Sequence, residues 1–101
     1  MPATRRSEDA GFDAVQAGIE VADAHGLARM GALLRINLVD LELTAGRPQA
    51  ALAAAQAAAP VVQRLRDRRL ERVLLHNRGL ARLALGQLFG GRRDLDAALA
   101  L

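Results

Sequence analysis

The side chains that could carry out chemistry are scattered through this sequence of 101 residues and form no catalytic pattern. The carboxylates lie in different segments, and no Ser/His/Asp triad or carboxylate pair for acid–base work can be assembled from them. The two histidines, His25 and His76, are far apart, and neither has a second histidine three or four residues away. The lack of cysteine also excludes disulfides, thiolate metal sites and a cysteine nucleophile. We therefore expect no enzymatic activity, no metal and no other cofactor.

The segment Gly90-Gly91-Arg92-Arg93 has the glycine and cation content of a phosphate-binding loop. It lacks the Walker spacing and the terminal Lys-Ser/Thr that hold a nucleotide phosphate. We interpret it as a turn that precedes the last helix.

Five of the 14 basic residues gather in one place, between residues 64 and 72. All 14 are arginine, the net charge is +3, and most are interleaved with acidic residues. Because Asp67 and Glu71 lie within the cluster, and no aromatic side chain for base stacking is interleaved with its arginines, we expect a solvated corner with local ion pairs. A nucleic-acid-binding helical protein that uses this basic corner stays open as the alternative, although nucleic acid is the less favoured partner. The basic corner, residues 64–72, consists of Arg64, Arg66, Arg68, Arg69 and Arg72.

The elements that position these side chains are helices, since no segment shows the alternation or β-branched enrichment of a strand. Glycine and proline divide the chain into expected helices over residues 7–25, 27–45, 49–66 and 68–85, with a fifth after the glycine pair. Gly26, Gly46 and Gly86 are placed to take the left-handed conformation that ends a helix, and Asp67 can cap the fourth helix. Pro60 falls inside the third helix, where we favour a kink.

Composition is consistent with an all-α fold. Hydrophobic residues make up 51% and aromatic residues 2%, so the core must be built from Ala, Leu and Val at short distances between helices. We expect a flexible tail over residues 1–7 and one helical domain over residues 8–101. No apolar run is long enough for a signal peptide or a membrane span, and we expect a cytoplasmic protein.

An internal repeat of forty residues relates two parts of the chain, since Asn37 matches Asn77 and Gly46 matches Gly86. Such a repeat predicts helical hairpins that stack on one another, because one hairpin cannot cover its own apolar face. The apolar end of the chain should expose Leu95 and Leu99 unless something covers them, so we expect self-association or further sequence there. If the repeat were accidental, the chain would instead form a helical-bundle homodimer, with its helices arranged about a closed core.

The chain resembles the tetratricopeptide repeat family in the segments that begin at Asn37-Leu38-Val39 and Asn77-Arg78-Gly79, and in the glycine between paired helices. The resemblance covers roughly residues 8–101. The usual period is about 34 residues, and forty resembles a longer-helix variant of bacterial regulators and signalling enzymes. This chain departs from the family pattern in two ways. Gly91 stands where Ala51 stands one repeat earlier, and no bulky aromatic residue lies between the helices.

This resemblance implies a stack of antiparallel hairpins whose first helices line a groove that binds a protein or a peptide. In the family an asparagine near the start of that helix bonds the backbone of the bound peptide, which implies this role for Asn37 and Asn77. An interpretation left open is that each asparagine instead ties two helices together. The resemblance also implies a scaffold within a larger bacterial regulatory protein. The expected groove residues are Asn37, Asp40, Thr44, Val73, His76, Asn77 and Leu80.

Overall fold

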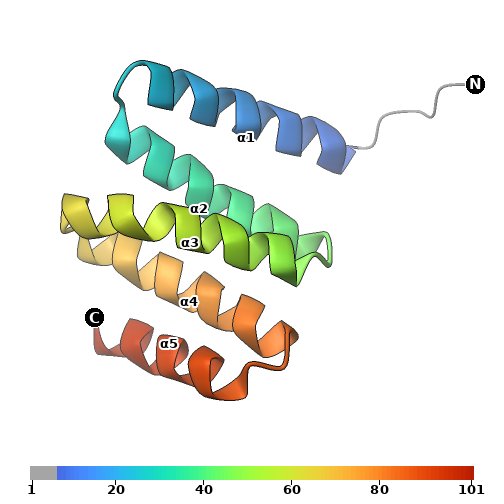
Figure 1. Ribbon diagram of the computed structural model, residues 1–101, viewed down its shortest axis with the longest axis vertical. Coiled ribbons are helices and arrows are strands. Elements are labelled where there is room, and N and C mark those ends of the chain that lie inside the picture. The colour runs from blue at the N-terminus through green and yellow to red at the C-terminus, as the bar shows by residue number, and fades with distance from the viewer. Residues whose placement is uncertain (1–6) are drawn as a thin grey trace, which may run out of the picture.

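The computed structural model describes residues 7–101, and this part of the chain consists of five α-helices and no strands (Figure 1). The all-α prediction is confirmed. The predicted tail, residues 1–7, lies outside the described residues except for Ser7, which begins the first helix. The helices are α1 (Ser7–Ala24), α2 (Ala28–Thr44), α3 (Pro48–Leu65), α4 (Arg68–Ala84) and α5 (Leu88–Ala100).

Left-handed residues end the helices at the turns. Gly26, Gly46 and Gly86 have φ values of 66°, 75° and 79°, as their positions in the sequence predict. After each glycine, the next residue donates its N–H to the carbonyl five residues before it, at 2.8 Å, as in a Schellman motif. At the turn between α3 and α4, forty residues after Gly26, Arg66 takes the same conformation with φ 50°. Each turn reverses the chain, so successive helices are antiparallel.

The hairpins α2–α3 and α4–α5 stack in series, because α4 packs against both α3 and α2. Helices α2 and α4 begin at residues 28 and 68 and end at 44 and 84, so both ends differ by forty residues. In Figure 1 the helices follow one another in chain order down the long axis of the molecule. The molecule measures 49 × 34 × 15 Å, a thin slab that excludes the alternative of a closed bundle.

The core depends on the alanine-rich helix α3, which lies between α2 and α4. Ala51, Ala54, Ala55 and Ala58 are buried, so this alanine-rich helix is part of the core. Small side chains here let neighbouring helices approach closely. Helix α3 continues through the exposed Pro60, so the proline does not end it.

The glycine pair at residues 90 and 91 is part of α5, which begins at Leu88, so the predicted turn at this place is wrong. The reason is packing. Gly91 is buried, and a Cβ there would lie 2.7 Å from the Cγ of Leu83 and 3.0 Å from the carbonyl oxygen of Gly79 on α4. These glycines therefore allow α4 and α5 to approach each other closely.

Candidate functional site

The predicted groove residues lie along solvent-accessible faces of α2 and α4. On α2, Asn37, Asp40 and Thr44 are exposed and recur at three- and four-residue spacing. Because α2 and α4 are neighbours with the same direction and a forty-residue register, equivalent positions lie on the same side of the stack. The α2/α4 face, as we call this surface, consists of Met30, Leu33, Asn37, Asp40 and Thr44 from α2 and Val73, His76, Asn77, Leu80 and Ala84 from α4.

The two asparagines do not tie the helices together. Within residues 7–101, Asn37 is exposed and its side chain makes no hydrogen bond, while the Oδ1 of Asn77 lies 3.3 Å from the Nδ1 of the adjacent His76. Neither amide reaches a backbone carbonyl of a neighbouring helix, so the interpretation of an inter-helix bond is wrong for the described chain. The Asn77 amide nitrogen and the whole Asn37 side chain remain available to a ligand.

Large apolar side chains are exposed beside these amides. Leu33, Val73 and Leu80 are 45%, 44% and 39% exposed, and Met30 is exposed as well. Asp40 adds a negative charge to the surface at physiological pH. An apolar surface with separate polar groups can bind a partner by burying area while hydrogen bonds fix its orientation.

Val73 and His76 also line a groove of about 400 Å³ between α4 and α5, which the sequence did not predict. Arg72 is at its rim, and Leu95, Ala98 and Leu99 come from α5. Leu99 is 87% exposed, as predicted, but Leu95 is half-buried because it lies near Gly79. The α4–α5 groove, as we call it, is almost entirely apolar inside.

The basic corner does not form the local ion pairs that its sequence predicts. The Oδ2 of Asp67 accepts a hydrogen bond from the Nη1 of Arg29 on α2 at 2.7 Å, and its Oδ1 accepts the N–H groups of Arg69 and Leu70. Asp67 therefore caps α4, as expected, and also links α4 to α2. The Arg29 hydrogen bond, followed by that of the Leu70 N–H, holds the pKa of Asp67 below its ordinary value.

The basic side chains of the corner itself are exposed. Within the described residues no carboxylate pairs with Arg64, Arg66, Arg68 or Arg69, and Arg72 donates a hydrogen bond to the carbonyl oxygen of Leu101 at 3.2 Å. The corner is therefore a concentration of positive charge that the fold leaves facing solvent.

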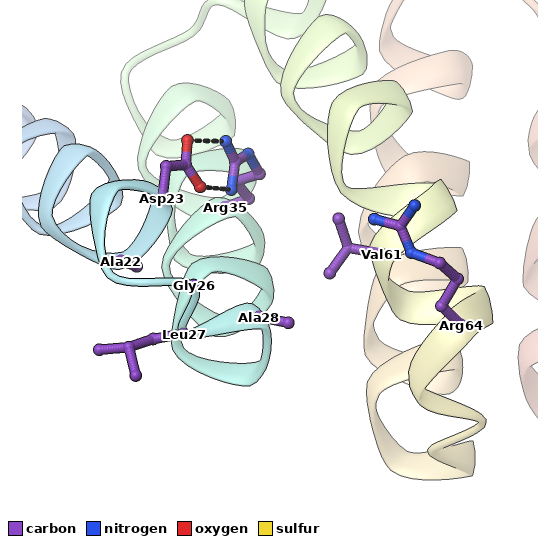
Figure 2. A pocket seen from close by; sticks show the side chains of 8 residues that line it. All are labelled: Ala22, Asp23, Gly26, Leu27, Ala28, Arg35, Val61 and Arg64. Carbon is purple, nitrogen blue, oxygen red and sulfur yellow. Dashed lines mark hydrogen bonds and ion pairs between the residues drawn. The ribbon is translucent and has the colours of Figure 1, made fainter.

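A second pocket, of about 340 Å³, lies where the turn between α1 and α2 faces α3. Figure 2 shows Asp23 and Arg35 paired on one side, with Val61 and Arg64 of α3 on the other. Arg35 donates to both oxygens of Asp23, at 2.7 and 3.2 Å, and this bond lowers the pKa of the Asp23 carboxyl. Because these two groups satisfy each other, the pair joins α1 to α2 and offers no reactive group.

Models of protein families, curated protein sequences and solved structures were compared with this chain, and none matches it. The tetratricopeptide resemblance therefore stays a prediction based on the asparagine and glycine spacing. What the structure itself shows is an all-α stack of helical hairpins.

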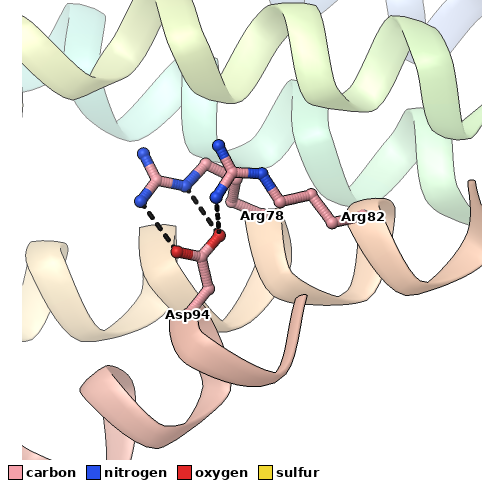
Figure 3. A network of polar contacts seen from close by, with 3 residues as sticks. All are labelled: Arg78, Arg82 and Asp94. Carbon is pink, nitrogen blue, oxygen red and sulfur yellow. Dashed lines mark hydrogen bonds and ion pairs between the residues drawn. The ribbon is translucent and has the colours of Figure 1, made fainter. Parts of the chain in front are cut away.

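One polar cluster that the sequence analysis missed joins α4 to α5. Asp94 is only 3% exposed. It accepts two hydrogen bonds from Arg78 and one from Arg82, each at 2.9 Å (Figure 3). The sequence contains a signal for this cluster. Arg78, Arg82 and Asp94 differ in charge or polarity from the residues that lie forty positions before them. The replaced residues are Leu38, Glu42 and Ala54.

The part of the chain that the structure describes contains neither a metal-binding cluster nor a membrane-spanning helix. There the structure brings together no group of three or more His, Cys, Asp or Glu side chains that could hold a metal ion. None of the helices described has both the length and the hydropathy needed to cross a bilayer.

Proposed function

We propose that this chain is a helical scaffold that binds another protein or a peptide on the α2/α4 face. The observation that carries the proposal is the exposure of Leu33, Val73 and Leu80 beside the unbonded amide of Asn37 on two stacked hairpins. Apolar side chains exposed side by side are typical of interaction surfaces. No comparable set of groups for bond-making chemistry lies on this face.

An extended segment fits the chemistry of this face. Its backbone would receive hydrogen bonds from Asn37 and Asn77, and its apolar side chains would cover the leucines and valine between them. Asp40 would favour a basic residue in the same segment, since opposite charges attract across an interface. The long repeat period further supports a place within a larger bacterial regulatory or signalling protein. The lack of cysteine supports a cytoplasmic location.

The experiment selects ligands from a displayed library of random extended peptides and measures the affinity of the selected peptide by fluorescence anisotropy. We expect the double substitution Asn37→Ala and Asn77→Ala to weaken binding by about thirtyfold, because each of the two lost hydrogen bonds contributes about 1 kcal/mol. The matched control changes two exposed amides of α3, Gln49→Ala and Gln56→Ala, and should leave the affinity unchanged. Equal affinities for the asparagine variant and the control would refute the proposed site.

A second candidate function is nucleic-acid binding at the basic corner. It is favoured by the exposure of five arginines there, four of which, Arg64, Arg66, Arg68 and Arg69, have no carboxylate partner in the described chain. Binding of labelled single-stranded RNA and duplex DNA should then fall steeply with salt, because phosphate contacts release counterions.

The variant that tests this candidate replaces Arg64, Arg68 and Arg72 by glutamine. The control replaces Arg92 and Arg93, exposed arginines of α5. If nucleic acid does not bind at low salt, or if both variants bind it equally, the basic corner is not a nucleic-acid site.

A further inference from the structure

The α4–α5 groove corresponds, position by position, to a surface of the preceding hairpin that is mostly covered. A shift of forty residues places its six lining residues on one patch of α2 and α3, in which Ile36 and most of the alanines are buried. Helix α4 packs on α2 and α3 and covers most of this patch, while Leu33 at its edge stays exposed. The groove between α4 and α5 is therefore the equivalent docking place for one more helix. The corresponding pairs are Arg72 and Ala32, Val73 and Leu33, His76 and Ile36, Leu95 and Ala55, Ala98 and Ala58, and Leu99 and Ala59.

The ion pair that joins α2 to the N-terminus of α4 also has an equivalent position forty residues later. Arg29 of α2 pairs at 2.7 Å with Asp67, the residue that caps the covering helix α4. The residue forty positions after Arg29 is Arg69, which is exposed and has no carboxylate partner among residues 7–101. Arg69 therefore lies where it can pair with an acidic cap of a helix seated in the α4–α5 groove.

We propose that the α4–α5 groove binds an amphipathic α-helix of a partner protein, and that this helix begins with an acidic N-cap. The spacing follows α4, in which Asp67 is the cap and Leu70 and Leu74 are the buried side chains. The partner helix thus carries apolar residues three and seven positions after its cap. Most of the α2/α4 face lies outside this groove, so the inference goes beyond the proposed function.

The side chains of the groove define the partner more closely. Leu74 and Ala59 line one crevice between α3 and α4, and Leu99 stands at the position equivalent to Ala59. The larger leucine leaves less room, so the seventh position of the partner helix takes a side chain smaller than leucine, such as valine. Arg72 and His76 replace apolar residues at the rim, which favours a helix with acidic flanks.

The probe is a synthetic helical peptide based on the sequence of α4. It keeps the Asp67 cap and Leu70, carries valine in place of Leu74, and has glutamate in place of the exposed arginines. Binding to the full chain is measured by fluorescence anisotropy at concentrations up to about 1 mM, so that a weak contact is also detected. We expect saturable binding that Leu99→Arg weakens at least tenfold. Phe89→Arg, a matched change of a 97% exposed side chain on the same helix, should leave binding unchanged.

A double-mutant cycle tests the charged contact. The peptide with asparagine at the cap keeps the helix start but loses the charge, and we expect it to bind about threefold more weakly than the aspartate peptide. In the Arg69→Gln variant the two peptides should bind equally. Circular dichroism melting of Leu99→Arg and Arg69→Gln shows whether the fold is retained, and both side chains are exposed.

Three outcomes would overturn the inference. They are no saturable binding at the highest concentration, equal effects of the Leu99 and Phe89 substitutions, or a groove blocked by a second copy of the chain. The last would appear as dimerisation in sedimentation equilibrium that Leu99→Arg abolishes. The Asn37→Ala, Asn77→Ala variant should still bind the helical peptide, so failure here and failure of the proposed function are distinguishable.

Discussion

Replacing Asp94 by alanine should destabilise the hairpin of α4 and α5. The substitution removes a carboxylate that is 3% exposed and leaves the Arg78 and Arg82 side chains, 21% and 18% exposed, without their acceptor. Removing one partner of a buried ion pair costs about 3–5 kcal/mol. Because both guanidinium groups keep some contact with water, we expect a loss of about 2–4 kcal/mol in the free energy of unfolding.

Urea unfolding followed by far-UV circular dichroism measures this loss. In a domain of this size each kcal/mol shifts Tm by roughly 4–8 °C, so the thermal transition should fall by roughly 8–30 °C. The matched control is Asp96→Ala on the same helix. Asp96 is exposed and lies 3.9 Å from Arg92, so its loss should change the free energy of unfolding by less than about 0.5 kcal/mol.

A rescue variant distinguishes two causes of the lost stability, namely unpaired buried charges and the loss of side-chain contacts. The preceding hairpin has Leu38 and Ala54 where this one has Arg78 and Asp94. The triple substitution Arg78→Leu, Arg82→Met and Asp94→Ala should therefore return to within about 1 kcal/mol of the wild-type stability, since apolar groups can replace a buried ion pair at little cost. A triple variant no more stable than Asp94→Ala, or an Asp94→Ala variant as stable as Asp96→Ala, would refute this reasoning.

Four other substitutions test local features. Arg66→Gly should raise the urea midpoint through a gain of about 0.5–1 kcal/mol, because a non-glycine side chain is unfavourable at φ 50°; a lower midpoint would contradict the left-handed cap. Gly79→Ala should cost about 1–3 kcal/mol, since its Cβ would lie 3.0 Å from a backbone oxygen, whereas Gly11→Ala, with nothing within 4 Å, should gain roughly 0.5–1 kcal/mol. Equal signs for the two alanines, measured by urea unfolding, would exclude the close helix approach. Asp67→Asn keeps a good cap but loses the bond to Arg29, and the lowered pKa of Asp67 fixes the sign of the pH effect. The wild type should exceed this variant in stability above the ordinary pKa of 3.8, and the difference should vanish as the pH falls through the lower pKa of the folded state; a difference that persists at pH values well below that would show another cause.

The helices and the repeat could be predicted from the sequence because local backbone chemistry sets them. A left-handed glycine ends a helix wherever it stands, and Gly26, Gly46 and Gly86 do so. The start of α5 could not be predicted in the same way. A glycine pair usually marks a turn, but tertiary packing on Gly79 and Leu83 requires Gly91 inside the helix, and this contact joins residues that the local sequence does not relate.

The exposed faces of α2 and α4 were also predictable, since three- and four-residue spacing places Asn37, Asp40 and Thr44 on one side of a helix. The ion-pair partners were not. Asp67 has arginines next to it in sequence but binds Arg29, which is 38 residues away, because the stacking of α4 on α2 brings that guanidinium to the cap. The partner of such an ion pair therefore depends on how the helices pack, which the local sequence does not determine.

The contacts between the two helices differ from one hairpin to the other, and this difference affects the α4–α5 groove. Val39 and Ala51 of the first hairpin are replaced by Gly79 and Gly91 in the second, where less side-chain volume separates the helices. A contact with so little side chain specifies register weakly, and a buried ion pair can supply that register. We therefore infer that Asp94 fixes how α5 lies along α4.

This inference predicts separate effects on stability and binding. The triple variant Arg78→Leu, Arg82→Met, Asp94→Ala should unfold at nearly the wild-type urea concentration and yet bind the helical probe peptide several-fold more weakly. The reason is that Leu95 and Leu99, one and five residues after Asp94, line the groove and move with α5. Wild-type affinity of the triple variant for the probe would mean that the apolar contacts alone set the register, and that the ion pair has no part in shaping the groove.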